Sequence, residues 1–354
     1  MGGVPDLWRT AALEPPRAFA ALPVTGRLRD TPEDFAVDEQ LGFEPDGAGQ
    51  HLLLRIRKRD ANTEWVGRQL ARHARVPVSD VGFAGLKDRR SIAEQWFSVP
   101  LRAAEARSWL DLREPGFEVV AVHAHLRKLR RGALAGNRFR IRVRALGGDP
   151  EAIIERLTLI RARGVPNYFG SQRFGSDGSN LTTLAGWAID GRELRTRSER
   201  SFTLSAGRSL LFNAVLTERV LRGDWDRLLP GDVASLDGSG SIFGVAAPTP
   251  ELEQRCAALD IHPTGPQWGK GESRAGGDVA DLENTVVGRF GPVAGALAAA
   301  GLEQERRSLR MKVAELAAER LEDGLEITFR LGPGEFATAV LRELGDFSTA
   351  GAHA

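Results

Sequence analysis

The sequence is poor in several features, and each shortage excludes a class of protein. Cys256 is the only cysteine in 354 residues, which excludes a fold stapled by disulfides. No apolar run approaches the roughly 18 residues of a membrane helix, and the charged N-terminal residues lack the apolar core of a signal peptide. With 42% hydrophobic and 27% charged residues, the chain is not disordered. We therefore expect a cytoplasmic protein of about two domains.

Motifs for cofactors and metals are also missing. The glycine-rich stretch 238–244 misses the spacing of a dinucleotide-binding loop, and residues 269–271 lack the spacing and the hydroxyl of a P-loop. Six histidines and one cysteine form no zinc-binding pattern. We expect neither a nucleotide cofactor nor a metal ion.

Lysine is scarce, since only 5 of the 48 basic residues are lysines and the other 43 are arginines. A GC-rich genome produces such a bias, and so does phosphate recognition, for which the guanidinium group is well suited. The net charge of +1 does not distinguish the two, but the local distribution of charge helps. The segment 123–144 has no acidic residue and eight basic ones: Arg127, Lys128, Arg130, Arg131, Arg138, Arg140, Arg142 and Arg144. It is either a solvated strand face or a surface that follows a phosphate backbone.

Hydrophobic periodicity predicts a chain of mixed strands and helices. Alternating or apolar runs predict strands at 51–59, 95–99, 117–124, 139–145 and 325–331. Helical spacing and capping residues predict helices after Asn62 and Thr63 and at 150–163, 205–222, 248–260, 281–302 and 336–344. The glycine-rich segments 164–180 and 265–278 are expected to be loops. Because a strand returns after a largely helical middle, we expect one sheet interrupted by an insertion.

The predicted strand 139–145 has the cleanest alternation in the chain. Phe139, Ile141, Val143 and Ala145 should face one way, and the intervening arginines the other. At its start, Asn137 and Phe139 supply an amide and a ring within the basic segment. Amides read base edges and rings stack on bases, so this mixture suits single-stranded or extruded RNA.

The segment 85–90, Gly-Leu-Lys-Asp-Arg-Arg, places one carboxylate among three cations. Positive neighbours favour the charged form of Asp88, and an ionised aspartate can act as a nucleophile or a base. An ordinary aspartate in a charged turn would look the same. In an extended segment, adjacent side chains point to opposite sides, so the cation that pairs with Asp88 is expected to come from elsewhere in the chain.

A third motif lies at 167–175, where asparagine, glycine and aromatic residues surround Tyr168, the only tyrosine. It is either a hydrophobic plug or a loop that faces nucleic acid.

Together these motifs resemble the TruD family of tRNA pseudouridine synthases. The resemblance runs along most of the chain, through PEDFAVDE (32–39), LGFEPDG (41–47), FAGLKDRR (83–90), EQWFSV (94–99), RKLRRGALAGNRF (127–139), GVPNYFGSQRFG (164–175) and FATAVLREL (336–344). It implies an α+β fold: a mixed, largely antiparallel sheet with flanking helices, interrupted by an α/β insertion domain. The catalytic domain would comprise 1–163 and 305–354, and the insertion 164–304.

The resemblance also implies a function. The family's catalytic aspartate falls on Asp88, and its substrate pocket on Phe35, Asn137 and Phe336, with Phe139 beside them. The substrate would be tRNA, with uridine at position 13 converted to pseudouridine and no cofactor required. Lys87, Arg89, Arg127, Lys128, Arg140 and Arg142 are expected to contact the RNA backbone. Arg89 stands where the family often has lysine, which keeps the charge.

Two other functions are compatible with the same residues. A non-catalytic RNA-binding protein or RNA chaperone would use the same basic surface. A methyltransferase is disfavoured, because no glycine-rich cofactor loop is present. A monomer is expected because one chain contains both a catalytic sheet and a cleft-forming insertion. The preferred tRNA species and the choice between a covalent and a glycal route remain open at this stage.

Overall fold

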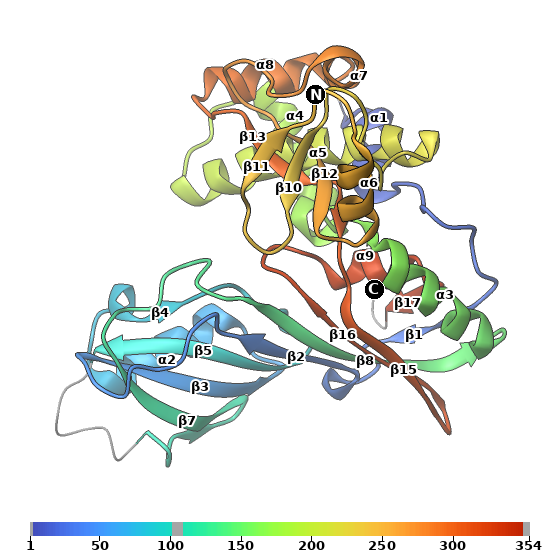
Figure 1. The fold of residues 1–354 in the computed structure, drawn as a ribbon. Helices are drawn as coiled ribbons and strands as arrows, with labels where there is room; N and C mark the ends of the chain where they lie inside the picture. The colour runs from blue at the N-terminus through green and yellow to red at the C-terminus, as the bar shows by residue number, and fades with distance from the viewer. Residues whose placement is uncertain (1–2, 101–108, 350–354) are drawn as a thin grey trace. The chain divides into compact units, whose positions relative to one another are not determined.

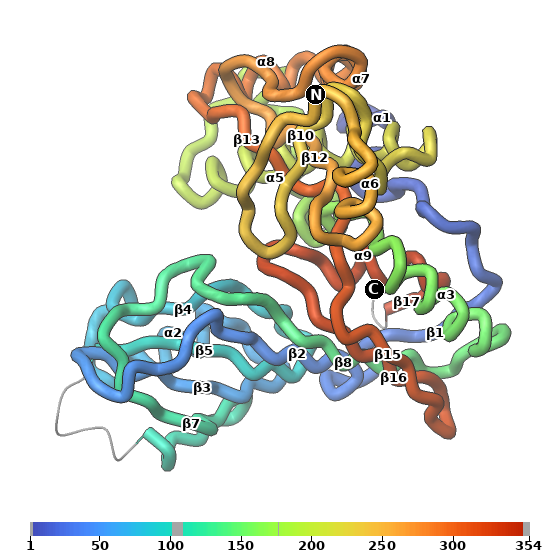
Figure 2. Tube along the Cα trace, viewed as in Figure 1, coloured from blue at the N-terminus to red at the C-terminus, as the bar shows by residue number. Residues whose placement is uncertain are grey.

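The computed structural model describes residues 3–100 and 109–349. As far as they are described, these residues form two compact units. The sheet unit comprises Pro23–Ile154, Ala314–Gly334 and Gly345–Ala354; the helical unit comprises Met1–Leu22, Glu155–Val313 and Glu335–Leu344. Each unit therefore joins segments that are far apart in the sequence, as the colours along the trace show (Figure 2).

The sheet unit is built on one large sheet of the described chain, with strand order β15-β16-β8-β2-β5-β3-β7-β6, while β1 pairs with β8 and β17, and β4 with β5. Neighbouring strands are antiparallel except in the pairs β1–β17 and β2–β5. This confirms the predicted mixed, largely antiparallel sheet. The strands are β1 (Thr25–Leu28), β2 (Phe35–Gln40), β3 (His51–Arg59), β4 (Gly82–Phe83), β5 (Ile92–Pro100), β6 (Arg113–Glu114), β7 (Phe117–His125), β8 (Gly136–Gly147), β15 (Ala314–Leu321), β16 (Gly324–Leu331) and β17 (Asp346–Thr349).

The sheet is interrupted in sequence, as predicted. Strand β16 lies antiparallel beside β8, in a register that runs from Gly324 opposite Arg144 to Leu331 opposite Asn137 (Figure 1). Nearly all of the helical unit lies between these two strands in the chain. The predicted division into a catalytic domain and an insertion at 164–304 stays a prediction.

Strand β8 follows the predicted alternation for most of its length. Phe139, Ile141 and Val143 are buried, whereas Arg140 is exposed. The expectation that Ala145 also faces the core is wrong. Ala145 is exposed and has a φ of 46°, so the backbone leaves the extended conformation there and the alternation ends.

One face of the sheet is covered by α2 (Thr63–Ala74), whose start was predicted correctly. Asn62 caps the helix, because its side chain accepts hydrogen bonds from the backbone N–H groups of Glu64 and Trp65. Val66 and Leu70 are completely buried, and they pack in a core with β3, β5 and β7. The short 3₁₀ helices η1 (Pro32–Asp34) and η2 (Val78–Asp80) complete the regular elements described in this unit.

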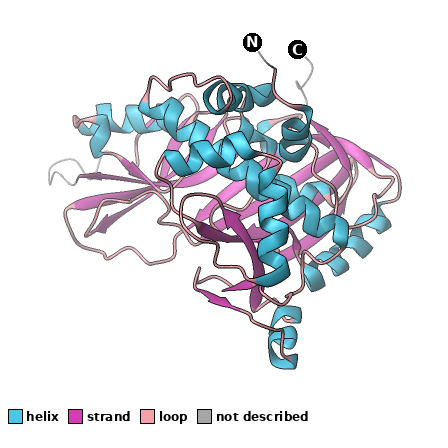
Figure 3. Cartoon of the chain, turned by 90° about the horizontal axis from the view of Figure 1, so that it is seen from above, coloured by secondary structure: helices cyan, strands magenta, loops and turns pink. Residues whose placement is uncertain are grey.

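The helical unit holds most of the described helices (Figures 1 and 3). Its four-stranded sheet has the order β11-β10-β12-β13, and β9 pairs with β14. The elements are α1 (Asp6–Leu13), α3 (Pro150–Arg163), β9 (Val165–Pro166), η4 (Ser171–Phe174), η5 (Ser176–Gly178), α4 (Ser179–Ala188), α5 (Arg197–Arg222), β10 (Val233–Leu236), β11 (Ile242–Gly244), α6 (Pro250–Ala257), β12 (Ile261–Gln267), α7 (Gly277–Gly288), α8 (Gly291–Ala299), β13 (Glu305–Ser308), β14 (Arg310–Met311) and α9 (Ala337–Arg342). The first five residues of α3, Pro150–Ile154, belong to the sheet unit. No described helix combines the length and the apolar character needed to cross a bilayer.

Two predictions for this unit need correction. Helix α5 begins at Arg197 rather than at Ser205, because Thr196 caps it by accepting a hydrogen bond from the backbone N–H of Glu199. The segment from Gly265 to Gln267 is not a loop but the end of β12, a buried strand. A Cβ at residue 265 would lie 2.7 Å from the side chain of Leu309, so any larger residue there would force this neighbour to shift.

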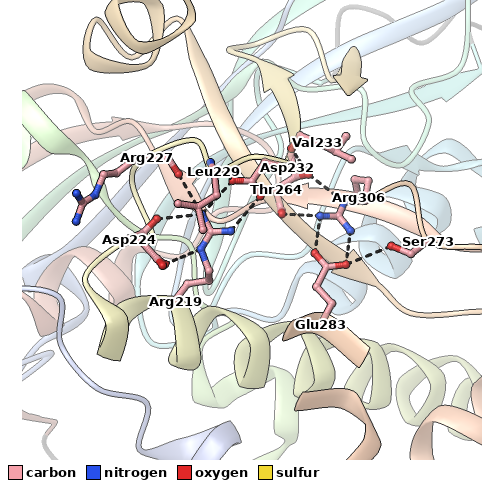
Figure 4. Close-up of polar contacts among 10 residues, drawn as sticks. All are labelled: Arg219, Asp224, Arg227, Leu229, Asp232, Val233, Thr264, Ser273, Glu283 and Arg306. Atoms are coloured by element: carbon pink, nitrogen blue, oxygen red, sulfur yellow. Dashed lines mark hydrogen bonds and ion pairs between the residues drawn. The ribbon is translucent and has the colours of Figure 1, made fainter. Parts of the chain in front are cut away.

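Two buried arginines tie the helical unit together (Figure 4). Arg219, on α5, donates to the carboxylates of Asp224 at 2.7 Å and Asp232 at 3.0 Å. Arg306, on β13, forms two hydrogen bonds of 2.7 and 2.8 Å with Glu283 of α7. Both partners of the Arg306–Glu283 pair are almost completely buried, so each charge depends on the other.

We predict that Glu283→Gln lowers the free energy of unfolding by about 3–5 kcal/mol, because it leaves the Arg306 charge buried without its counter-charge. Chemical denaturation measures this loss. The matched control is Glu303→Gln, which removes an exposed ion pair with Lys270 and should cost about 0–1 kcal/mol. Equal losses in the two variants would contradict the assignment.

Candidate active site

The predicted connection between two strands is residues 84–91, between β4 and β5, here called the Asp88 loop. Its backbone is tied to two neighbouring elements. The carbonyl of Gly85 accepts a 2.6 Å hydrogen bond from Gln95 Nε2, and the backbone N–H of Lys87 donates to Thr63 Oγ1 at 3.1 Å. The loop is therefore held by β5 and by the start of α2, in a fixed position above the sheet.

Asp88 pairs with a cation from a distant part of the chain, as the sequence predicted. Arg29 Nη2 lies 2.5 Å from Asp88 Oδ2. The same guanidinium lies 4.0 Å from the centroid of the Phe35 ring, so it is held between a carboxylate and an aromatic face. The Asp88 side chain is 41% exposed, which leaves it accessible to a ligand.

The predicted pocket residues of β2 and β8 lie on one face of the sheet. Phe35 and Phe139 are buried, and their ring centroids are 6.1 Å apart in an edge-to-face arrangement. Asn137 lies opposite Glu39 in the β2–β8 register. Within the described chain, the buried Asn137 Oδ1 accepts no hydrogen bond, although buried acceptors normally have a partner. That oxygen can therefore receive a hydrogen bond from a ligand.

Lys87 points inward. Its ammonium binds the Glu39 carboxylate, and the side chains of the two residues are only 6% and 0% exposed. Glu39 Oε1 also accepts from the backbone N–H of Trp96 at 3.2 Å. This burial does not fit the predicted contact between Lys87 and an RNA backbone. Lys87 instead fastens the Asp88 loop to β2.

Three residues at this site were not predicted: Arg29, Glu39 and Lys58. Lys58 is completely buried on β3 and donates a 2.7 Å hydrogen bond to the backbone carbonyl of Asp88. The sequence contained a signal for two of them. Glu39 and Lys58 occupy strand positions whose side chains, by the alternation of the strand, point inward. Arg29 gave no such signal, because it lies in a turn between β1 and η1 with a φ of 59°.

An exposed group of cations lies next to the Asp88 loop, on residues 126–132, here called the basic loop. Its cations are Arg127, Lys128, Arg130 and Arg131, all exposed. Leu129 is buried and anchors the loop, and the backbone N–H of Gly132 donates to the carbonyl of Ala84 at 2.7 Å. The three arginines form no ion pair with a carboxylate of the described residues, whereas the Lys128 ammonium donates to the backbone carbonyl of Ser79.

The arginines of β8 are placed differently. Arg140 and Arg142 project from the face of β8 opposite to Asn137 and Phe139. Both lie near the Glu326 carboxylate, Arg142 at 2.8 Å and Arg140 at 4.0 Å. Their charge is thus partly neutralised within the sheet.

Arg89, also predicted to contact RNA, has a side chain that is 70% exposed, and its guanidinium lies 3.4 Å from Asp60. Arg89 directly follows Asp88 in the loop, and because most of its side chain is exposed it remains accessible to a ligand.

Phe336 lies in the helical unit, where it precedes α9. Its ring centroid is 5.8 Å from that of Phe169, and the Arg173 guanidinium lies 5.7 Å above it. Tyr168 is buried, and burial raises the pKa of its hydroxyl. Of the two interpretations of the 167–175 motif, the hydrophobic plug therefore fits Tyr168.

No group of three or more metal-ligating side chains gathers among the described residues.

Comparison with known proteins agrees with this architecture. The sequence model of the family described as tRNA pseudouridine synthase D (TruD) matches residues 18–197 and 192–344. A tRNA pseudouridine synthase D of Methylococcus capsulatus is 44% identical over 337 residues, covering 95% of each chain. One from Xanthomonas campestris pv. campestris is 47% identical over 348 residues, covering 94% of each.

A solved structure has the same fold. The crystal structure of a putative tRNA pseudouridine synthase D from Methanosarcina mazei superposes with a TM-score of 0.70 at 21% identity, over 96% of this chain and 98% of that one. The matches define a pseudouridine-synthase fold. The chain belongs to the tRNA pseudouridine synthase D family.

We predict strong coupling between Lys87 and Glu39. Lys87→Met and Glu39→Gln should each lower the free energy of unfolding by about 3–5 kcal/mol, because each leaves one buried charge unpaired. The double variant should lose much less than the sum of the two. Denaturation of the four proteins measures the coupling. The exposed pair Arg59–Glu33 serves as the control and should show no resolvable coupling; additive losses at Lys87 and Glu39 would refute the prediction.

Proposed function

We propose that Asp88 is the catalytic carboxylate with which this chain converts uridine to pseudouridine in tRNA, with position 13 as the target. Conversion of uridine to pseudouridine in tRNA is the activity of the family to which the chain belongs. The single observation that carries the assignment is the Arg29–Asp88 pair, which joins an accessible carboxylate to the ring of Phe35. The division into a catalytic domain and a 164–304 insertion is part of the same proposal.

The reaction needs an ionised carboxylate next to a ribose. The N1–C1′ bond breaks, the uracil turns, and a C5–C1′ bond forms, while C5 loses a proton and N1 gains one. The Asp88 carboxylate can attack C1′ covalently, or take the C2′ proton to give a glycal and return it later. Arg29 supports both routes, because its guanidinium holds the carboxylate in place.

The detached uracil has to be retained while it turns. Phe35, which Arg29 links to Asp88, packs against the ring of Phe139, and the Asn137 Oδ1 can accept a hydrogen bond from an N–H group of the base. We propose that these residues form the uracil pocket; the contribution of Phe336, which belongs to the helical unit, stays a prediction. Extruding a base from its stack costs a few kcal/mol, and stacking on an aromatic side chain returns about 1–3 kcal/mol.

We further propose that the basic loop binds the phosphates around the extruded nucleotide. Its arginines are exposed, and the loop is hydrogen-bonded to the Asp88 loop. Arg89 extends this surface by one exposed guanidinium. The observed pairing of Arg140 and Arg142 with Glu326 makes β8 a weaker candidate for the same role. A monomeric state, a cytoplasmic location and independence of cofactors stay predictions.

Asp88→Asn should abolish product formation while preserving the fold and tRNA binding, because it removes the charge and keeps the shape. We expect turnover to fall by at least about 10²-fold. Release of tritium from tRNA labelled at uracil C5 measures turnover, and Asp111→Asn, at an exposed site, is the control. Wild-type tritium release by the Asp88 variant would refute the proposal. If the wild-type protein bound tRNA but formed no pseudouridine, the non-catalytic RNA-binding alternative would hold.

Replacing Arg127, Arg130 and Arg131 together by glutamine should weaken tRNA binding. It should also reduce the slope of log affinity against log salt by about 2–3, since each phosphate contact contributes about 0.7–0.9. Filter binding at several salt concentrations measures this. The matched control is the Arg140→Gln, Arg142→Gln double variant, which we expect to leave the slope nearly unchanged. The opposite pattern would place the RNA backbone along β8.

A further inference from the structure

Lys58 is a lysine without exposed surface beside the proposed catalytic residue. It lies on β3 at a position where the side chain points into the core, opposite Ala93 of β5 and Phe117 of β7. Its ammonium donates to two backbone carbonyls, that of Ala61 at 2.8 Å and that of Asp88 at 2.7 Å. Lys58 therefore contacts the Asp88 loop through the backbone of Asp88 itself.

The charge on this ammonium is costly to bury. Among the described residues, no carboxylate lies within ion-pair distance of Lys58, so carbonyl dipoles alone solvate it directly. The pKa of Lys58 is lowered to about 8: burial is the main cause, the Asp88 carboxylate opposes it, the nearby Lys87 adds to the lowering, and Asp60 opposes it. Glu39, on β2, forms its ion pair with Lys87 of the Asp88 loop. An uncharged side chain of similar length would fill the same space without this cost.

We propose that Lys58 is a positioning residue for the reaction, which uses its buried positive charge to fix the Asp88 backbone so that the carboxylate meets Arg29. The proposal rests on the catalytic role of Asp88 given above. Two cations then hold one residue at different atoms: Arg29 binds the carboxylate, and Lys58 binds the carbonyl. Charge-assisted hydrogen bonds are about twice as strong as neutral ones, so the charge matters for this contact.

The Asp88 carbonyl has a second donor that makes a natural comparison. Ser91 Oγ donates to it at 2.7 Å, the same distance as Lys58 Nζ. Ser91 carries no charge and does not titrate in the accessible range. Replacing Ser91 removes a hydrogen bond from the same oxygen without changing the local charge.

The proposal predicts opposite effects of pH on activity and stability. As pH rises through about 8, Lys58 in the folded protein loses its proton, the carbonyl contact weakens, and activity should fall. Over the same interval the unfolded chain still binds that proton, up to the ordinary lysine value of 10.5. The contribution of Lys58 to stability should therefore rise with pH, because the cost of burying its charge disappears.

The test compares wild type, Lys58→Met, Lys58→Arg and Ser91→Ala, with kcat and KM for tRNA measured from pH 6.5 to 9.5. We expect Lys58→Met to lower kcat at pH 7 by at least 10-fold with little change in KM, to melt no lower than wild type, and to lack the fall near pH 8. Lys58→Arg should keep more activity than Lys58→Met and also lack that fall, since guanidinium does not titrate there. Ser91→Ala should retain the fall. An alkaline loss that arises in the RNA would appear in all four proteins.

Several results would overturn the proposal. One is a Lys58→Met enzyme with wild-type kcat, or with the same fall near pH 8. Another is a loss of activity that is matched by a lower melting temperature, which would indicate a structural role alone. If neither Lys58 variant folds, a wild-type kcat that is flat from pH 7 to 9 still refutes it. Failure of the catalytic assignment is recognised separately, because Asp88→Asn would then be active.

Discussion

The account depends on holding one carboxylate in a fixed position while it remains accessible to a large substrate. The chain achieves this by pairing Asp88 with Arg29, which itself rests on the Phe35 ring. Arg29 lies between β1 and η1, whereas Asp88 lies between β4 and β5, so the fold brings together two residues that are distant in the sequence. Without this pair, the carboxylate, the Phe35 ring and the basic loop would lie close together but would not act in one reaction.

Strand alternation separates the roles of residues that are adjacent in sequence. On β8, Asn137 and Phe139 face the candidate pocket, whereas Arg140 and Arg142 face away and are paired with Glu326. The cations of the basic loop, where the backbone leaves the sheet, are exposed and form no ion pair with a carboxylate of the described residues. Positive charge is therefore available to a ligand beside the Asp88 loop. The arginines Arg140 and Arg142 of β8 are instead paired with Glu326 within the sheet. This separation follows from the period of two in a strand.

Much of the fold could be predicted from local patterns, because they reflect burial of one face. The strand at 51–59, the helix capped by Asn62 and the return of β16 to β8 are examples. At the site, the sequence indicated Asp88 and a remote cation but not its identity, since Arg29 is brought to Asp88 only by the fold. The prediction for Lys87 did not anticipate its burial. Its partner Glu39 is distant in the sequence, so the residues next to Lys87 give no sign of the buried ion pair. The strand alternation indicated that Glu39 and Lys58 point inward. Charged side chains are rare in a core, so this placement was not predicted.

The most direct measurement is a structure of the wild-type protein bound to tRNA that carries 5-fluorouridine at the target position. We expect the ribose C1′ of that nucleotide beside the Asp88 carboxylate, with Arg29 still paired to it and the base next to Phe35. A complex in which the ribose lies next to a different carboxylate, with Asp88 facing solvent, would contradict the account.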